Sequence, residues 1–161
     1  MFGRICLIVT MLVAMGIIGT RVSPVNAAGN QVPFKGSYAG TAAFDSSGTP
    51  VFNGTGMSSH LGRGTNQGYS VFTTAPVNCP GGVPNDQYET LTAADGDSLT
   101  IVSEDVACPE GPGQYHGTGN WMVIAGTGRF SDAKGKGTLD GHSDFVKGVF
   151  SIELSGTISK S

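Results

Sequence analysis

The stretch VKGVFSIELSGTI, residues 146–158, decides the fold class of this chain. Apolar side chains recur at every second position from Phe150 through Ile152 and Leu154 to Ile158, and most residues between them are polar. A period of two residues is typical of a β-strand with one buried side and one side facing solvent. We therefore expect a strand here whose apolar side lies in a core.

Similar short segments fill the chain from Phe34 onward, and none of them shows a sustained helical period. Turn-forming residues separate the segments, among them DSSGTP at 45–50 and ADGD at 94–97, where Asp-Gly is a strong hairpin signal. The predicted strands cover residues 35–44, 51–61, 68–74, 88–93, 98–104, 121–125, 137–142 and 146–158. These strands predict an all-β domain built from antiparallel hairpins.

The glycines within several of these segments favour a barrel over a flat sandwich, because glycine permits the bends and bulges by which a sheet closes. An immunoglobulin-like sandwich would place a tryptophan between its two cysteines, whereas Trp121 follows both. The segment 121–125, WMVIA, is apolar at nearly every position, which predicts a strand covered on both faces. We expect a single antiparallel, eight-stranded, calycin-like β-barrel over residues 29–161.

The first 28 residues are typical of a secretory signal peptide. Arg4 precedes the apolar run ICLIVTMLVAMGIIG, residues 5–19, and small residues follow near Ala27 and Ala28, after either of which cleavage is expected. The run has 15 residues, fewer than the roughly 20 that cross a bilayer. The sequence therefore predicts a secreted protein, extracellular or periplasmic, with no membrane span in its mature form.

Charge and cysteine content bear on the partners of the protein and on its disulfide bonding. Nine Lys and Arg face twelve Asp and Glu, for a formal charge of −3, which argues against nucleic acid as a partner. Without Cys6, two cysteines remain, and an even number in an exported chain predicts a disulfide between Cys79 and Cys108. Each is followed by proline, so we expect both in loops rather than within strands.

Common catalytic and metal-binding motifs are absent from the sequence: it has no GxSxG, no P-loop, no HExxH and no CxxC. The three histidines, His60, His116 and His142, are widely spaced and have no companions at metal-ligand intervals, although three strands of a barrel could still bring them together. The sequence therefore predicts no catalytic residue, no cofactor and no metal site.

Several short pieces resemble a known family. They are HLGR at 60–63, the ADGD hairpin at 94–97, GTGRF at 126–130 and the pattern A-x-G-x-G-T-L at 133–139. Together they are similar to bacterial secreted proteins of the allene oxide cyclase-like barrel family, with plant allene oxide cyclases and dirigent proteins as more distant relatives in fold. The resemblance implies a closed barrel over about residues 34–158, and it carries over no catalytic residue.

An eight-stranded barrel can enclose one small molecule, and apolar strand faces would give it an apolar wall. We therefore expect a binding module for a small hydrophobic ligand, with His60, Arg63, Trp121 and Arg129 as candidate ligand contacts. Each also has a structural interpretation: Arg129 would bond open carbonyls at a strand end, His60 and Arg63 would brace neighbouring strands, and Trp121 would belong to the core.

Two alternatives to a binding module stay open. In the first, side chains fill the interior, and the barrel is a structural or interaction protein of the envelope or extracellular space. In the second, the barrel is a cyclase-like or dirigent-like enzyme that acts mainly by confining its substrate. His60 and Arg63 would then be the candidate acid or base and anion-binding groups, with His116 as a partner from another strand.

Overall fold

The computed structural model describes residues 30–159, which form eight β-strands and one short 3₁₀ helix. In chain order these are β1 (Gln31–Phe44), β2 (Pro50–Ser58), β3 (Gly62–Phe72), β4 (Val83–Ala93), β5 (Ser98–Gly111), β6 (Gln114–Gly126), the helix η1 (Gly128–Phe130), β7 (Gly135–Asp144) and β8 (Val149–Ser159). The predicted signal peptide, residues 1–28 with Cys6, lies outside the described residues. Within the described residues, no helix has the length and hydropathy needed to cross a membrane.

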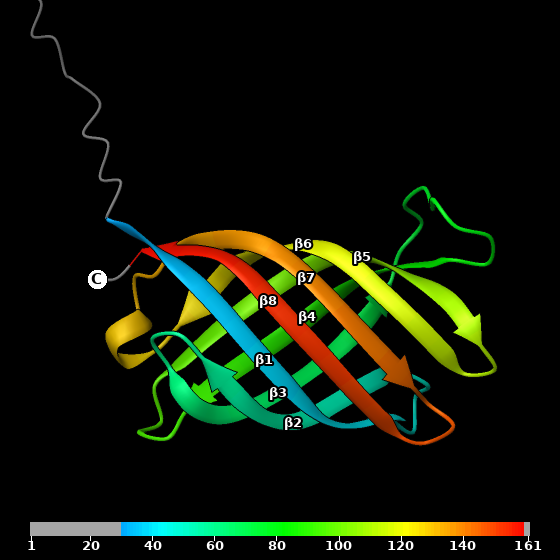
Figure 1. The fold of residues 1–161 in the computed structure, drawn as a ribbon, viewed down its shortest axis with the longest axis horizontal. Coiled ribbons are helices and arrows are strands. Elements are labelled where there is room, and N and C mark those ends of the chain that lie inside the picture. Colours follow the sequence, from blue (N-terminus) through cyan, green and yellow to red (C-terminus); the bar gives the residue numbers. More distant parts are fainter. Residues whose placement is uncertain (1–29, 160–161) are drawn as a thin grey trace, which may run out of the picture.

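The strands form a closed barrel of simple up-and-down connectivity (Figure 1). Each strand pairs antiparallel with the next, and β1 closes the barrel by pairing with β8 from Gln31↔Ser159 to Thr41↔Val149. The predicted all-β, eight-stranded antiparallel barrel is thereby confirmed. Closure pairs every strand on both sides, so the sheet has no long open edge.

Side chains along β8 alternate between the barrel interior and solvent, as the sequence predicted. Phe150, Ile152 and Leu154 are buried in the interior, and the residues between them, such as Ser151 and Glu153, face outward. The same alternation along the other strands completes a core of large apolar side chains. Its largest fully buried apolar members are Phe34, Tyr38, Leu91, Leu99, Ile101, Trp121, Phe130 and Ile158.

The expectation that strand 121–125 is covered on both faces was wrong. Trp121 is 1% exposed inside the barrel, but Met122 and Ile124 are 51% and 49% exposed on its outer wall. A single closed sheet has one interior, and within the described residues no second layer packs on the outside. The two outward residues are therefore apolar surface groups rather than core.

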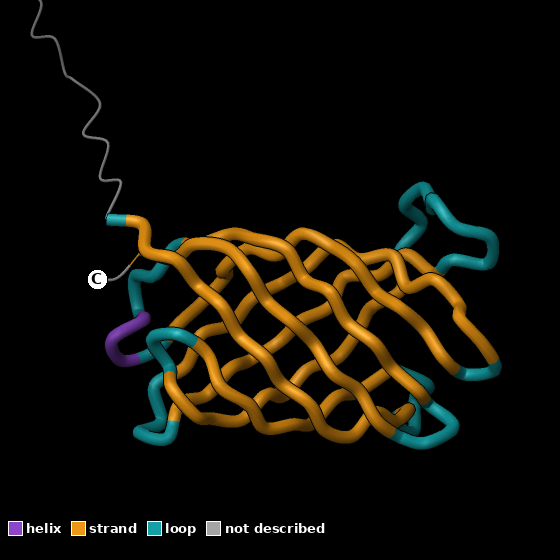
Figure 2. The backbone as a smooth tube through the Cα atoms, in the orientation of Figure 1, coloured by secondary structure: helices purple, strands orange, loops and turns teal. Residues whose placement is uncertain are grey.

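The two ends of the barrel differ. The helix η1 lies at one end of the barrel (Figure 2). Phe130 of η1 is buried, and so are Leu61, Leu91 and Leu99 in or beside the turns at this end. At the opposite end lie the loop of residues 73–82 and the turns that follow β1, β5 and β7 (Figure 1). We call these the closed end and the open end.

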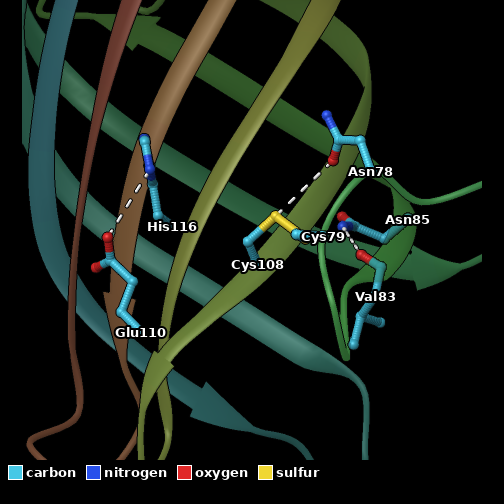
Figure 3. Close-up of a disulfide and its surroundings, with 7 residues drawn as sticks. All are labelled: Asn78, Cys79, Val83, Asn85, Cys108, Glu110 and His116. Carbon is cyan, nitrogen blue, oxygen red and sulfur yellow. Dashed lines mark hydrogen bonds and ion pairs between the residues drawn. A yellow bond between two sulfur atoms is a disulfide. The ribbon is translucent and has the colours of Figure 1, made fainter.

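The predicted disulfide is present at the open end. Cys79 and Cys108 are joined, and the bond ties the loop of residues 73–82 to β5 (Figure 3). Cys79 lies in that loop as predicted, but the placement of Cys108 in a loop was wrong, because β5 continues to Gly111. Beyond Ala107 the register gives β5 no partner on the β4 side, so Pro109 interrupts no ladder there.

Removing the disulfide is expected to lower the free energy of unfolding by about 3.5 kcal/mol. The bond spans 29 residues of chain, and the loop-entropy model gives this cost for a closed loop of that length. Urea denaturation of a Cys79→Ser, Cys108→Ser double variant measures this loss. In thermal denaturation the same variant should melt roughly 10 °C below the wild type. The wild type unfolded in reductant is the matched control, and a loss below about 1 kcal/mol in both would contradict this prediction.

Candidate functional site: a cavity at the open end

The interior is not completely filled at the open end, where a cavity of about 140 Å³ remains. Aromatic rings surround its mouth. Phe145, in the turn between β7 and β8, stacks on Phe44 with ring centroids 4.5 Å apart, and the ring of Tyr115 stands edge-on to Phe145 at 6.2 Å. Phe52 and Phe150 line the wall below. The upper part of the cavity is therefore apolar and aromatic.

One side of the cavity, formed by β3, β4 and β5, is polar, and we call this side the floor. Inward-facing positions of β3, β4 and β5 contribute Ser70, Asn85, Gln87 and Asp105 to its lining. Asn85 and Asp105 are register partners on β4 and β5, which places their side chains next to each other. Because side chains alternate along a strand, these polar residues face the interior just as the apolar residues of the other strands do. The barrel interior therefore contains both apolar and polar side chains.

Two acceptor atoms on the floor have no hydrogen-bond partner within the described residues: Asn85 Oδ1 and Asp105 Oδ1. The other oxygen of Asp105, Oδ2, accepts a hydrogen bond from Ser103 Oγ at 3.1 Å, and Asn85 Nδ2 donates to the Val83 carbonyl at 3.3 Å. A buried acceptor without a donor costs free energy. Asn85 and Asp105 both line the cavity, so rotation of their side chains would turn these buried oxygens toward a donor on a bound molecule.

A second acid lies deeper in the interior. Glu89 is fully buried, and its carboxylate accepts hydrogen bonds from Asn66 Nδ2 at 2.6 Å and Gln87 Nε2 at 2.5 Å. Gly68 provides the space on the neighbouring strand, because a methyl group there would lie 2.6 Å from Glu89 Oε1. Glu89 thus supports the polar floor through Gln87, which it holds in place.

Burial raises the pKa of both acids. The pKa of Glu89 rises to about 7, because loss of hydration outweighs the hydrogen bonds from Gln87 and Asn66. The pKa of Asp105 rises to about 6 for the same reason, with only the Ser103 hydroxyl opposing it. Near neutral pH these carboxyl groups therefore lie close to the point at which they gain or lose a proton, a property common at functional sites.

The four residues predicted as ligand contacts do not line this cavity. His60 lies in the β2–β3 turn at the closed end with a φ of 77°, and its Nε2 is 2.9 Å from the Pro33 carbonyl oxygen. Arg129 joins it there: its guanidinium lies 3.4 Å from the His60 carbonyl oxygen and forms ion pairs with Asp95 and Asp97.

The other two predicted contacts have different environments. Arg63 is exposed near the start of β3. Trp121 is a core residue whose Nε1 donates to the Thr138 carbonyl at 3.0 Å. The structure therefore brings together only His60 and Arg129 of the four, and it places them at the closed end, where they fit the bracing role weighed from sequence.

The residues on the cavity floor were missed, although the sequence contains a signal for them. In VPNDQYETLTA, residues 83–93, counting back by twos from Leu91 gives Glu89, Gln87 and Asn85. The predicted strand began at residue 88, so Asn85 and Gln87 were left in a loop. The structure also places His116 beside His142, two histidines that the sequence analysis described as widely spaced.

Comparison of the chain with protein-family models, with curated proteins and with solved structures finds no match. The resemblance to the allene oxide cyclase-like family therefore stays a prediction. The proposed function below therefore depends on the fold and the cavity of this chain.

Proposed function

We propose that this barrel is a binding protein for a small, mainly apolar molecule that carries one hydrogen-bond donor, best supplied by a protonated amine. The observation that carries the proposal is the pair of unpartnered acceptors, Asn85 Oδ1 and Asp105 Oδ1, below a mouth lined by aromatic rings. It refines the expectation of a small hydrophobic ligand, because the floor of the cavity is polar and acidic.

The size of the cavity limits the ligand. At about 140 Å³ it is close to the engineered apolar cavity of about 150 Å³ that holds benzene. A molecule of about one aromatic ring fits inside, with its ring against Phe52 and Phe150. A long acyl chain would extend through the mouth.

The charges around the floor favour a cationic donor over an anion. Asp105 lines the cavity and has an unpartnered oxygen, and the second buried acid, Glu89, is hydrogen-bonded to Gln87 of the same lining. A hydrogen bond between a protonated amine and a carboxylate is about twice as strong as one between neutral groups. A ligand carboxylate would instead meet two acceptor oxygens and repulsion from Asp105.

We also infer that the protein works in an oxidising compartment, in keeping with the predicted secretion. The disulfide between Cys79 and Cys108 supports this inference, since such bonds persist mainly in exported proteins. A cyclase-like activity based on His60 and Arg63 gains no support from the geometry, because the cavity lining contains neither residue. Asp105 would be the group for any proton transfer in the cavity.

Three one-ring probes test the proposal: benzylamine, benzyl alcohol and benzoate, each titrated into ¹⁵N-labelled protein and followed by NMR. We expect benzylamine to bind most tightly, with a dissociation constant below about 1 mM, and benzoate most weakly. The perturbed amides should be those of β4, β5 and the 144–149 turn. If no probe perturbs these amides, the proposal is wrong, and the alternative of a structural or interaction protein is favoured.

Asp105→Asn is expected to weaken benzylamine binding about tenfold and to leave benzyl alcohol nearly unchanged. The variant keeps the shape of the side chain but removes the charge that strengthens the hydrogen bond to the amine. Glu104→Gln is the matched control, because Glu104 is the adjacent residue of β5 and faces solvent. Equal losses in the two variants would show that general charge, not the cavity floor, governs binding.

A further inference from the structure

A cluster of histidines and carboxylates lies on the outer wall of the barrel, outside the cavity lining except for His142 at its rim. His116 on β6 and His142 on β7 are register partners, so their side chains leave neighbouring strands at the same level. Their rings are stacked with centroids 4.4 Å apart and planes 8° from parallel. The two imidazoles therefore present matching edges in the same directions.

Asp140 lies at one of these edges. It is two residues before His142 on β7 and so shares the outer face of that strand. Its Oδ2 is 3.1 Å from Nε2 of His116, and its Oδ1 is 4.0 Å from Nε2 of His142. One ligand atom from each of the three residues lies within 4.8 Å of the other two.

Glu110 of β5 lies at the opposite edge of the rings. Its Oε2 is 3.4 Å from Nδ1 of His142, and its Oε1 is 3.9 Å from Nδ1 of His116, the contact drawn in Figure 3. The register places Cys108 opposite His116, and the disulfide anchors this part of β5, two residues before Glu110. The carboxylate is therefore positioned to accept the Nδ1–H of an imidazole whose Nε2 is free to bind elsewhere.

We propose that His116, His142 and Asp140 bind a divalent transition-metal ion, best represented by Zn²⁺ or Cu²⁺. Bonds of about 2.0–2.1 Å from such an ion would need the three ligand atoms to approach slightly, which side-chain rotation at an exposed site permits. Two imidazoles and one carboxylate suit these ions and do not suit Ca²⁺ or Mg²⁺, which prefer oxygen ligands. Three protein ligands leave a fourth position for water.

The competing explanation is a set of ordinary surface ion pairs with protons in place of the metal. In that arrangement His116 donates its Nε2–H to Asp140 Oδ2 at 3.1 Å and His142 directs its Nδ1 to Glu110 Oε2 at 3.4 Å, so one suitable tautomer of each ring satisfies the shorter contacts. These contacts leave Nε2 of His142 4.0 Å from Asp140 Oδ1, whereas a metal ion would bind both Nε2 atoms and the Asp140 carboxylate together. The convergence of the three ligand atoms therefore favours a shared metal ion over separate ion pairs.

Isothermal titration of the untagged protein, with its disulfide intact, with ZnCl₂ and separately with CuCl₂ tests the proposal. We expect one ion per chain, and His116→Ala and His142→Ala should each weaken binding more than tenfold. Glu110→Gln should weaken it about tenfold through loss of the Nδ1–H acceptor. In ¹⁵N NMR of the side chains, Zn²⁺ should shift the Nε2 signals of both histidines.

Two controls separate this site from general metal affinity. His60→Ala removes the histidine at the closed end, and Glu153→Gln removes the exposed carboxylate that is the register partner of Asp140 on β8. Both variants should bind as the wild type does. The absence of 1:1 binding at about 0.1 mM metal, or wild-type affinity in both histidine variants, would overturn the proposal and leave the proton-bridged ion pairs. Neither outcome tests the proposed ligand cavity, which is probed separately with benzylamine, benzyl alcohol and benzoate.

Discussion

Between about pH 5 and pH 8, the free energy of unfolding of the wild-type barrel is expected to fall by about 4 kcal/mol. The fall comes from Glu89 and Asp105, whose folded-state pKa values of about 7 and about 6 lie above their ordinary values of 4.5 and 3.8. Across this window the folded barrel still holds protons that the unfolded chain has released. Stability therefore decreases as pH rises through the folded pKa values and levels off at about pH 8.

Three other acids act in the opposite direction but outside this window. Hydrogen bonds from Ser47, Arg129 and Lys147 lower the pKa of Asp45, Asp95 and Asp144 respectively. Their contribution to stability is complete above their ordinary pKa and is lost as pH falls toward the lowered folded values. The barrel should therefore be most stable at about pH 4–5, and chemical denaturation across this range measures the curve.

Glu89→Gln should remove the larger part of the fall and be about 2–3 kcal/mol more stable than the wild type at about pH 8. A glutamine at this position can accept from Gln87 through Oε1. It can donate through Nε2 to Asn66 Oδ1, now unpartnered, once the Asn66 amide rotates. Glu104→Gln, on the outer face, should follow the wild-type curve. A flat or rising wild-type curve would show that these acids are hydrated in the folded state.

The parts of the fold set by local periodicity could be predicted from the sequence. The two-residue alternation along residues 146–158 predicted β8 and its buried face, and the Asp-Gly at 95–96 predicted the β4–β5 turn. The even cysteine count predicted the disulfide. In each case a short-range pattern or a simple count carries the information, and the glycines within the strands favoured the closed barrel that the structure shows.

The cavity floor was harder to predict because its residues break the usual link between polarity and exposure. The inward positions of β4 include Asn85, Gln87 and Glu89. Apolar residues are expected at such positions, so the start of this strand resembled a loop in the sequence. Only closure of the barrel shows that Asp105 of the next strand faces the same space. The functional features of this interior are thus local exceptions to the pattern that identifies the fold.

The histidine cluster depends on the register between β6 and β7, which the sequence does not reveal. His116 and His142 meet because β6 and β7 are joined so that these residues are directly opposite, and a shift of one residue would turn one ring into the barrel. Glu110 joins them only because β5 continues past Cys108, beyond the strand end expected from sequence. Long-range pairing, rather than any motif, creates this site.

Replacing Trp121 by alanine is expected to lower the free energy of unfolding by about 4 kcal/mol. The indole is 1% exposed and meets Phe34 edge-on, with ring centroids 5.6 Å apart. It covers two glycines on β7 and β8, since a methyl group at Gly137 or Gly156 would lie 2.7 Å from its ring. Alanine would leave a large cavity between three strands that cannot close over it, because closed pairing fixes the strand spacing.

Urea denaturation followed by far-ultraviolet circular dichroism measures the loss, because Trp121 is the single tryptophan of the chain and its fluorescence disappears with it. Trp121→Phe keeps most of the ring but removes the Nε1 donor to the Thr138 carbonyl, and should cost about 1–2 kcal/mol. Met122→Ala, one residue along and half exposed on the outer wall, should cost less than about 0.5 kcal/mol. Equal losses at residues 121 and 122 would contradict the inward packing of the indole, because only the inner side chain leaves a cavity when it is removed.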